Sequence, residues 1–156
     1  MSGAALRVFR SSGLKGFTRD ISGDRRSVKA RKLEREVHVQ FALTDSIVTT
    51  REGAVHAHAG DAIITGVAGE KWRVSRVRFA DKYRPQPPLT AGEPGPYVSR
   101  PYEILALRMT EAFEVVLADG VSRLHGQPDD WLVDYGDGSL GVVAPGIFAT
   151  TYETVS

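Results

Sequence analysis

The sequence of 156 residues contains no cysteine. Disulfide bonds, thiolate metal sites and a cysteine nucleophile are therefore excluded. The first sixteen residues lack the unbroken apolar run of about 7–15 residues that marks a signal peptide. No stretch approaches the roughly 20 apolar residues that span a bilayer. We therefore expect a soluble, cytoplasmic protein without a membrane partner.

The motifs of several enzyme classes are also absent. The chain has no Gly-x-Ser-x-Gly nucleophile elbow and no His-Glu-x-x-His zinc motif. Gly66 and Gly69 do not form a phosphate-binding fingerprint, because no helix start with Lys-Ser/Thr follows them. His56 and His58 share one face of an expected strand, but the further ligands of a usual metal site are not in view. We predict no metal site and no cofactor.

The net charge is only +1, but it is unevenly distributed. Residues 1–36 contain ten Lys/Arg and four Asp/Glu, whereas residues 37–156 contain ten Lys/Arg and fifteen Asp/Glu. The first segment has few apolar residues in register, and we predict a solvated or loosely packed basic arm. Contact with an anionic partner, including nucleic acid, is its alternative role.

The chain is organised around an internal duplication. The stretch from Gly60 to Tyr83 aligns without a gap on Asp129 to Tyr152, sixty-nine positions later. Trp72 falls on Gly141, and Trp131 falls on Ala62. One large ring per copy, at complementary positions, is what a core shared by the two copies would tolerate. The aligned pairs include Asp61–Asp130, Ile64–Val133, Gly69–Gly138, Val74–Val143, Phe79–Phe148 and Tyr83–Tyr152.

Each copy has the pattern of antiparallel hairpins followed by a short helix. Period-two alternation and β-branched residues predict the strands, and glycine-containing turns predict the hairpins between them. Aromatic pairs four residues apart, Phe79–Tyr83 and Phe148–Tyr152, predict one helical face in each copy. Ser75 and Pro145 suit the starts of these helices. We expect strands at residues 37–41, 46–50, 54–58, 61–65, 70–74, 102–109 and 112–118.

Residues 84–101 contain six of the eight prolines and are typical of an extended, stiff spacer. The chain thus divides into a basic arm (1–36), a first repeat unit (37–84), a Pro-rich linker (85–101) and a second repeat unit (102–156). A unit of about fifty residues has a marginal core by itself. We therefore predict a β-rich α+β fold, in which two tandem hairpin units, each ending in a short helix, pack as one pseudo-symmetric domain.

Short motifs recur in the two copies. The second copy has Asp129 where the first has Gly60, and Ser139 where the first has Glu70. The pattern resembles the PGDYG domain family of small bacterial and bacteriophage proteins, over residues 49–84 and 117–153. The resemblance implies a module without an established activity, cofactor or substrate. The motifs of the first copy are Glu52-Gly53, Gly60-Asp61, Ile63-Ile64, Gly69-Glu70, Trp72, Phe79 and Tyr83.

Glu70, beside Trp72 and with Asp61 across the hairpin, is the best candidate for a chemical cluster. A carboxylate against an indole can have a raised pKa and act as a general acid. The competing interpretation is structural: Asp61 caps a turn, and Glu70 pairs with a neighbouring cation. These neighbouring cations are Lys71, Arg73 and Arg76.

Basic and aromatic residues gather in the same stretch. Trp72, Arg73, Arg76 and Tyr83 are candidates to hold a phosphate or a nucleic-acid backbone, together with Arg78 and Lys82. The alternative is an ordinary solvated face. In the second copy, four aspartates are interpreted as a solvated acidic edge. They are Asp129, Asp130, Asp134 and Asp137.

Three functional hypotheses follow. The first is a non-catalytic binding or accessory module that uses the groove between the copies and the Trp72/Arg73/Arg76 face. The second is a small enzyme that acts on a nucleotide-like or other anionic substrate, with Glu70 and Asp61 as acid/base residues in a pocket of the first copy only. The third is a structural or oligomer-forming protein, with the Pro-rich linker and the strand edges as contact surfaces.

Overall fold

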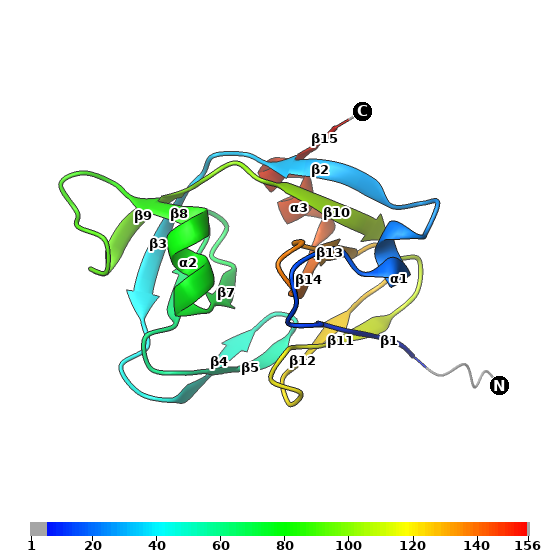
Figure 1. The fold of residues 1–156 in the computed structure, drawn as a ribbon, viewed down its shortest axis with the longest axis horizontal. Helices are drawn as coiled ribbons and strands as arrows, with labels where there is room; N and C mark the ends of the chain where they lie inside the picture. The colour runs from blue at the N-terminus through cyan, green and yellow to red at the C-terminus, as the bar shows by residue number, and fades with distance from the viewer. Residues whose placement is uncertain (1–5, 156) are drawn as a thin grey trace.

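The computed structural model describes residues 6–155, and strands dominate it (Figure 1). Its helices are short: α1 (Arg19–Ser22), α2 (Arg76–Lys82) and α3 (Pro145–Thr151). None of these helices is long and apolar enough to cross a membrane. The strands are β1 (Arg7–Arg10), β2 (Val28–Lys32), β3 (Glu36–Phe41), β4 (Ser46–Thr50), β5 (Gly53–Ala57), β6 (Ala62–Thr65), β7 (Lys71–Val74), β8 (Tyr83–Pro85), β9 (Gly95–Ser99), β10 (Glu103–Arg108), β11 (Phe113–Val116), β12 (Arg123–Gly126), β13 (Trp131–Asp134), β14 (Leu140–Val143) and β15 (Tyr152–Thr154).

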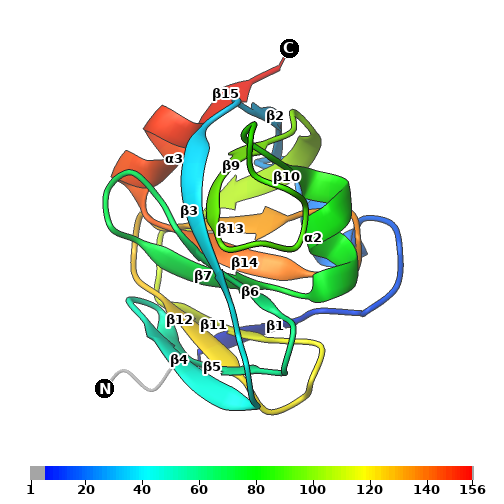
Figure 2. The ribbon, with the colours of Figure 1, turned by 90° about the vertical axis from the view of Figure 1, so that its left-hand side faces the viewer.

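Two antiparallel sheets of five strands form most of the fold. Their orders are β7-β6-β3-β9-β8 and β14-β13-β10-β2-β15. They occupy opposite ends of the long axis in Figure 1, and in Figure 2 the first lies in front of the second. The β4–β5 hairpin and the β1-β11-β12 sheet, in which β1 runs parallel to β11, complete the structure beneath them.

The hairpins and helices predicted from the two copies are confirmed. The β6–β7 and β13–β14 hairpins have matching registers, since Ala62 faces Val74 and Trp131 faces Val143. The Oγ atom of Ser75 accepts a hydrogen bond from the backbone N–H of Arg78 at the start of α2, while Pro145 opens α3. Local turn and capping chemistry therefore acts in the fold as the sequence indicates.

Most of the predicted basic arm is part of the fold. Strand β1 pairs with β11, and β2 lies between β10 and β15. Phe9 and Ile21 are buried in the core. The prediction of a solvated or loosely packed arm is therefore wrong for β1, Ile21 and β2, because these strands and apolar side chains complete the second half of the molecule, while residues 12–17 are exposed.

The end of the Pro-rich segment is also a strand. Strand β9 inserts between β3 and β8, so residues 95–99 are built into a sheet instead of forming a spacer. Pro96 lies near the start of this strand, opposite His38, and its carbonyl accepts the N–H of Gln86. The segment that separates the two halves is thus limited to residues 86–94.

Strands β2 and β9 cross between the two halves. Strand β2 precedes β3 in the chain but pairs with β10 and β15, whereas β9 precedes β10 but pairs with β3 and β8. Each five-stranded sheet consequently takes four strands from one half and one from the other. The two halves of the chain therefore cannot separate without breaking hydrogen-bond ladders.

The buried apolar residues form three clusters. One surrounds Phe79 and Tyr97 under the first sheet, and another surrounds Ile104 and Phe148 under the second. A third lies between the second sheet and β1, α1 and β11. Trp72 packs in the first of these clusters and Trp131 in the second. The two tryptophans therefore do not share a core, contrary to the expectation from their alignment.

Candidate functional site

A cavity of about 400 Å³ lies between the two halves of the molecule. Its wall includes residues of β2, β7 and α2 on one side and of β14 and α3 on the other. Glu70 and its aligned residue Ser139 both line it. The cavity is thus shared by both copies and is not confined to the first.

Lys32 projects into this cavity from the end of β2. Its side chain is almost completely buried, with a relative exposure of 5%. The Nζ atom donates a hydrogen bond to the hydroxyl of Tyr83 at 3.1 Å, and within residues 6–155 no carboxylate pairs with it. Its Nζ also lies 5.2–5.7 Å from the ring centres of Trp72, Tyr83 and Tyr102. The cavity wall therefore holds an ammonium group that is surrounded by aromatic rings.

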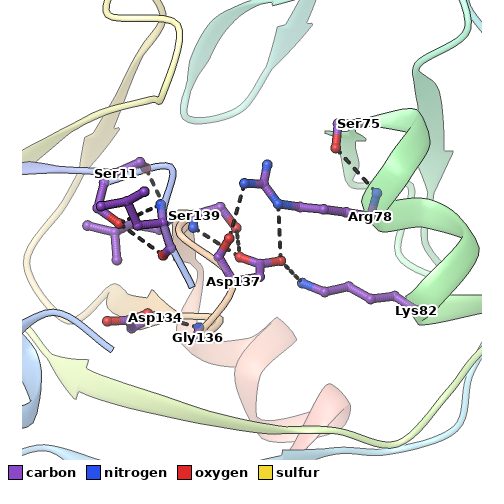
Figure 3. Close-up of polar contacts among 11 residues, drawn as sticks. Ser11, Ser75, Arg78, Lys82, Asp134, Gly136, Asp137 and Ser139 are labelled. Atoms are coloured by element: carbon purple, nitrogen blue, oxygen red, sulfur yellow. Dashed lines mark hydrogen bonds and ion pairs between the residues drawn. The ribbon is translucent and has the colours of Figure 1, made fainter. Parts of the chain in front are cut away.

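A second lysine approaches from α2. The Nζ atom of Lys82 lies 2.7 Å from Oδ2 of Asp137 in the β13–β14 turn, and Nε of Arg78 lies 3.5 Å from the same oxygen (Figure 3). Burial lowers the pKa of Lys82, although Asp137 opposes the shift. Burial would raise the pKa of Asp137, but hydrogen bonds from Lys82 and Ser139 outweigh it and lower that pKa. These contacts tie the two halves together.

The N-terminal segment holds the β13–β14 turn in place. The backbone N–H groups of Gly13 and Gly16 donate to the carbonyls of Gly138 and Gly136, at 2.8 Å each. The N–H of Leu140 donates to Oγ of Ser11, which lies beside the turn in Figure 3. Residues 11–16 thus fix the turn that presents Asp137 to α2.

Four tyrosines surround the two lysines: Tyr83, Tyr102, Tyr135 and Tyr152 all line the cavity. Burial raises the pKa of Tyr102, Tyr135 and Tyr152 above the usual value of 10. Their hydroxyls are therefore neutral at physiological pH, and each retains a proton that it can donate. The combination of ammonium groups and neutral hydroxyls suits an anion.

The two copies contribute different rings to the cavity at complementary positions. Trp72 is aligned with Gly141, and Tyr135 is aligned with Gly66. A Cβ atom on Gly141 would lie 2.7 Å from the hydroxyl oxygen of Tyr135, so the glycine makes room for the ring. The duplicated hairpins thus place one indole and one phenol on the cavity wall instead of two identical groups.

Arg73 and Asp61 form a pair at the far end of the β6–β7 hairpin from its turn. Nη1 of Arg73 lies 3.1 Å from Oδ2 of Asp61, which also accepts the N–H of His58 at 2.9 Å. Nε of Arg73 is buried and has no hydrogen-bond partner within residues 6–155. Arg73 lines the cavity, but Asp61 does not.

Glu70 lies at the turn end of the same hairpin. Its Oε1 accepts the N–H of Ala68 at 3.0 Å, and its carboxylate covers Gly66, where a Cβ would overlap it. None of the cations expected as its partners forms an ion pair with it in the described part of the chain. Asp61 and Glu70 are separated by five steps of strand, about 16 Å at 3.3 Å per residue. The structure does not bring the two carboxylates together.

The remaining predicted residues divide between the cavity and the surface. Trp72 and Tyr83 line the cavity, whereas Arg76 is exposed and packs over Gly60 outside it. The prediction of a solvated acidic edge is wrong for Asp130 and Asp134, which are each 1% exposed. Asp130 accepts hydrogen bonds from Arg51 and Gln127, and Asp134 accepts them from Thr18 and Gly136. These carboxylates can be buried because they accept hydrogen bonds from backbone N–H groups in the adjoining turns and loops.

Sequence reasoning missed Lys32, Tyr102, Tyr135 and Tyr152 as cavity residues. Lys32 lies in the segment interpreted as an arm, and Tyr102 directly follows the expected linker. Tyr152 carried a signal, since it repeats Tyr83 in the alignment. Within residues 6–155, no group of three or more His, Asp or Glu side chains is arranged to hold a metal ion.

Comparison with known proteins gives one match. A family described as PGDYG protein matches residues 53–153, which include both hairpin units and both of the longer helices. No curated protein and no solved structure matches the chain.

Proposed function

This chain belongs to the PGDYG family, and we propose that it is a non-catalytic module that binds a small organic anion in the cavity between its halves. The family description states neither a ligand nor a reaction, so the proposal depends on the residues of the cavity wall.

The environment of Lys32 carries the proposal. Burying an ammonium group without a counter-charge costs several kcal/mol. The hydroxyl of Tyr83 and the three aromatic rings offset part of that cost, since each cation–π contact contributes about 0.5–2 kcal/mol. An anion in the cavity supplies the missing counter-charge, because Nζ retains N–H donors that the protein does not use.

The size and wall of the cavity favour an organic anion over an inorganic one alone. A volume of about 400 Å³ falls within the range of roughly 300–1,000 Å³ that small-molecule sites occupy. Trp72, Leu140 and Val142 add apolar surface beside the charged groups. A ring or short apolar body can pack against these side chains while its anionic group reaches Lys32.

The same proposal includes the symmetry of the fold: the two units are related by an approximate twofold axis, and the cavity lies near that axis. Two pairs of backbone hydrogen bonds support it. In the first pair, the backbone N–H of Lys32 donates to the carbonyl of Tyr102, and the N–H of Ser99 donates to the carbonyl of Arg35. In the second pair, the N–H of Leu33 donates to the carbonyl of Thr151, and the N–H of Arg100 donates to the carbonyl of Lys82. In each pair the donors are sixty-seven residues apart and the acceptors are offset by a similar amount.

The enzyme hypothesis has less support. Its acid/base pair is divided, because Asp61 is paired with Arg73 away from the cavity, whereas Glu70 lines the cavity. Turnover of a phosphate ester or other anionic substrate that is lost in Glu70→Gln, with binding retained, would replace the binding proposal by the catalytic one.

Thermal unfolding with phenyl phosphate as the probe tests the proposal. We expect millimolar phenyl phosphate to raise the Tm of the wild-type protein, because a ligand that binds the folded form stabilises it by mass action. Lys32→Met should lose this response. Its ligand-free Tm should equal or exceed that of the wild type, because the substitution removes a buried charge that has no carboxylate partner.

Lys29→Met is the matched control, since Lys29 is exposed on the same strand and does not line the cavity. It should respond to phenyl phosphate as the wild type does. A Lys32→Met protein that still responds, or a wild type that responds to neither phenyl phosphate nor benzoate, would contradict the proposal.

A further inference from the structure

We propose that the anion bound in this cavity is a dianion of the phosphomonoester class, held between Lys32 and Lys82. This inference rests on the proposed function and specifies the charge and geometry of the ligand's anionic group.

The two ammonium groups approach the same aromatic ring from different elements. Nζ of Lys32, at the end of β2, lies 5.7 Å from the ring centre of Tyr102. Nζ of Lys82, at the end of α2, lies 4.8 Å from the same centre. Both residues line the cavity, so both charges act on one part of it.

The charges around this ring do not balance. Three cations gather there, namely Lys32, Arg78 and Lys82, and Asp137 forms ion pairs with the last two. Among residues 6–155, one carboxylate thus faces three positive charges in this part of the cavity. The carboxylates elsewhere on the wall are engaged on other elements: Glu52 pairs with Arg51, Glu70 accepts from the β6–β7 turn, and Glu36 accepts from Gln86. A dianion compensates for the two charges in excess, whereas a monoanion leaves one.

The donors around the lysines suit a tetrahedral group. A phosphoryl dianion presents three strong acceptor oxygens. Lys32 and Lys82 each use one of three N–H donors within the protein, for Tyr83 and Asp137 respectively. Tyr102, Tyr135 and Tyr152 line the same cavity. This many donors exceeds what one planar carboxylate needs, so the chemistry favours a phosphomonoester over a carboxylic acid.

Isothermal titration calorimetry with two aromatic probes, each with a tetrahedral anionic group, tests the inference. At about pH 8, well above the second pKa of about 6 of a phosphomonoester, phenyl phosphate is a dianion, while benzenesulfonate is a tetrahedral monoanion. We expect the wild type to bind phenyl phosphate about tenfold more tightly than benzenesulfonate, as for one added charge-assisted contact. Lys82→Met should bind both probes more weakly, phenyl phosphate by the larger factor, and lose most of this preference.

Lys82→Arg, which keeps the charge, should retain the preference, and Lys29→Met should behave as the wild type. This pair of variants separates loss of the charge from loss of the fold, which the Tm of each protein reports. Equal affinity of the wild type for the two probes would overturn the inference that the ligand is a dianion, but not the proposed binding function. A preference unchanged in Lys82→Met would exclude Lys82 as the second cation. Binding of neither probe would overturn the proposed function as well.

Discussion

Asp129 carries a conformational cost at the scale of the single residue. Within the described chain it is the one non-glycine residue with a positive φ, 77°, and its counterpart Gly60 has a φ of 92°. The left-handed conformation allows the following aspartate to turn inward, where Oδ2 of Asp130 accepts the N–H of Gln127. Asp61 does the same with His58. The Gly-Asp motif is therefore a turn device, in which the glycine supplies the φ and the aspartate caps the turn.

Asp129→Gly should stabilise the protein by about 0.5–1 kcal/mol. A left-handed conformation costs an L-residue roughly 1–2 kcal/mol, and the larger backbone entropy that glycine loses on folding offsets part of the gain. The lost pair with Arg108 is exposed and contributes little. Urea unfolding measures the change, and Arg108→Ala, which removes the same pair alone, is the control. A variant less stable than both the wild type and the control would show that the Asp129 side chain has another role.

At the scale of the element, the β13–β14 turn connects three parts of the molecule. It belongs to the second sheet, its Asp137 contacts α2, and its backbone pairs with residues 11–16. A Cβ atom on Gly138 would lie 2.5 Å from the backbone of Gly13 and Leu14. The aligned turn of the first unit has Ala68 at the position of Asp137, so the ionic contact exists in one copy only.

Gly138→Ala should therefore destabilise the protein by about 3 kcal/mol or more, since it combines a positive φ of 93° with a backbone clash. Gly120→Ala is a matched comparison: its φ is 72°, but no heavy atom lies within 4 Å of the added carbon, so about 1 kcal/mol is expected. Chemical unfolding of both variants separates the two contributions. Equal effects would mean that residues 11–16 do not pack against the turn in solution.

The whole molecule depends on the exchange of β2 and β9. Each sheet would lose an interior strand if its half stood alone, which would leave β3 and β8, or β10 and β15, without the strand between them. Unpaired backbone groups in the middle of a sheet are costly. The cavity depends on the same exchange, because Lys32 belongs to β2 and lies among residues of both halves.

Cleavage between Thr90 and Ala91, in the loop between β8 and β9, should give two fragments that are not folded alone and recover the native fluorescence of Trp72 and Trp131 when mixed. Far-UV circular dichroism and size-exclusion chromatography report the folding and association of each fragment. Cooperative unfolding of residues 1–90 in isolation would contradict this expectation, since that fragment lacks β9 and the partners of β2.

Part of the candidate site was predictable from residues close together in the chain. Trp72, Arg73 and Tyr83 belong to one hairpin and helix, and all three line the cavity. Arg76 belongs to the same stretch, but the first turn of α2 directs it outward. Asp61 and Glu70 flank one hairpin, which predicts that they face each other, yet they lie at its opposite ends.

The sequence by itself determined much of the local structure of the two repeat units. Within them, period-two alternation specified strands, glycine and aspartate specified the turns, and Ser75 and Pro145 specified the helix starts, since these signals act over a few residues. Only the tertiary structure decided the partners of β2 and β9, because pairing between strands distant in sequence depends on contacts that no local pattern contains. That pairing buries Lys32 among the rings of both halves, and so it creates the cavity.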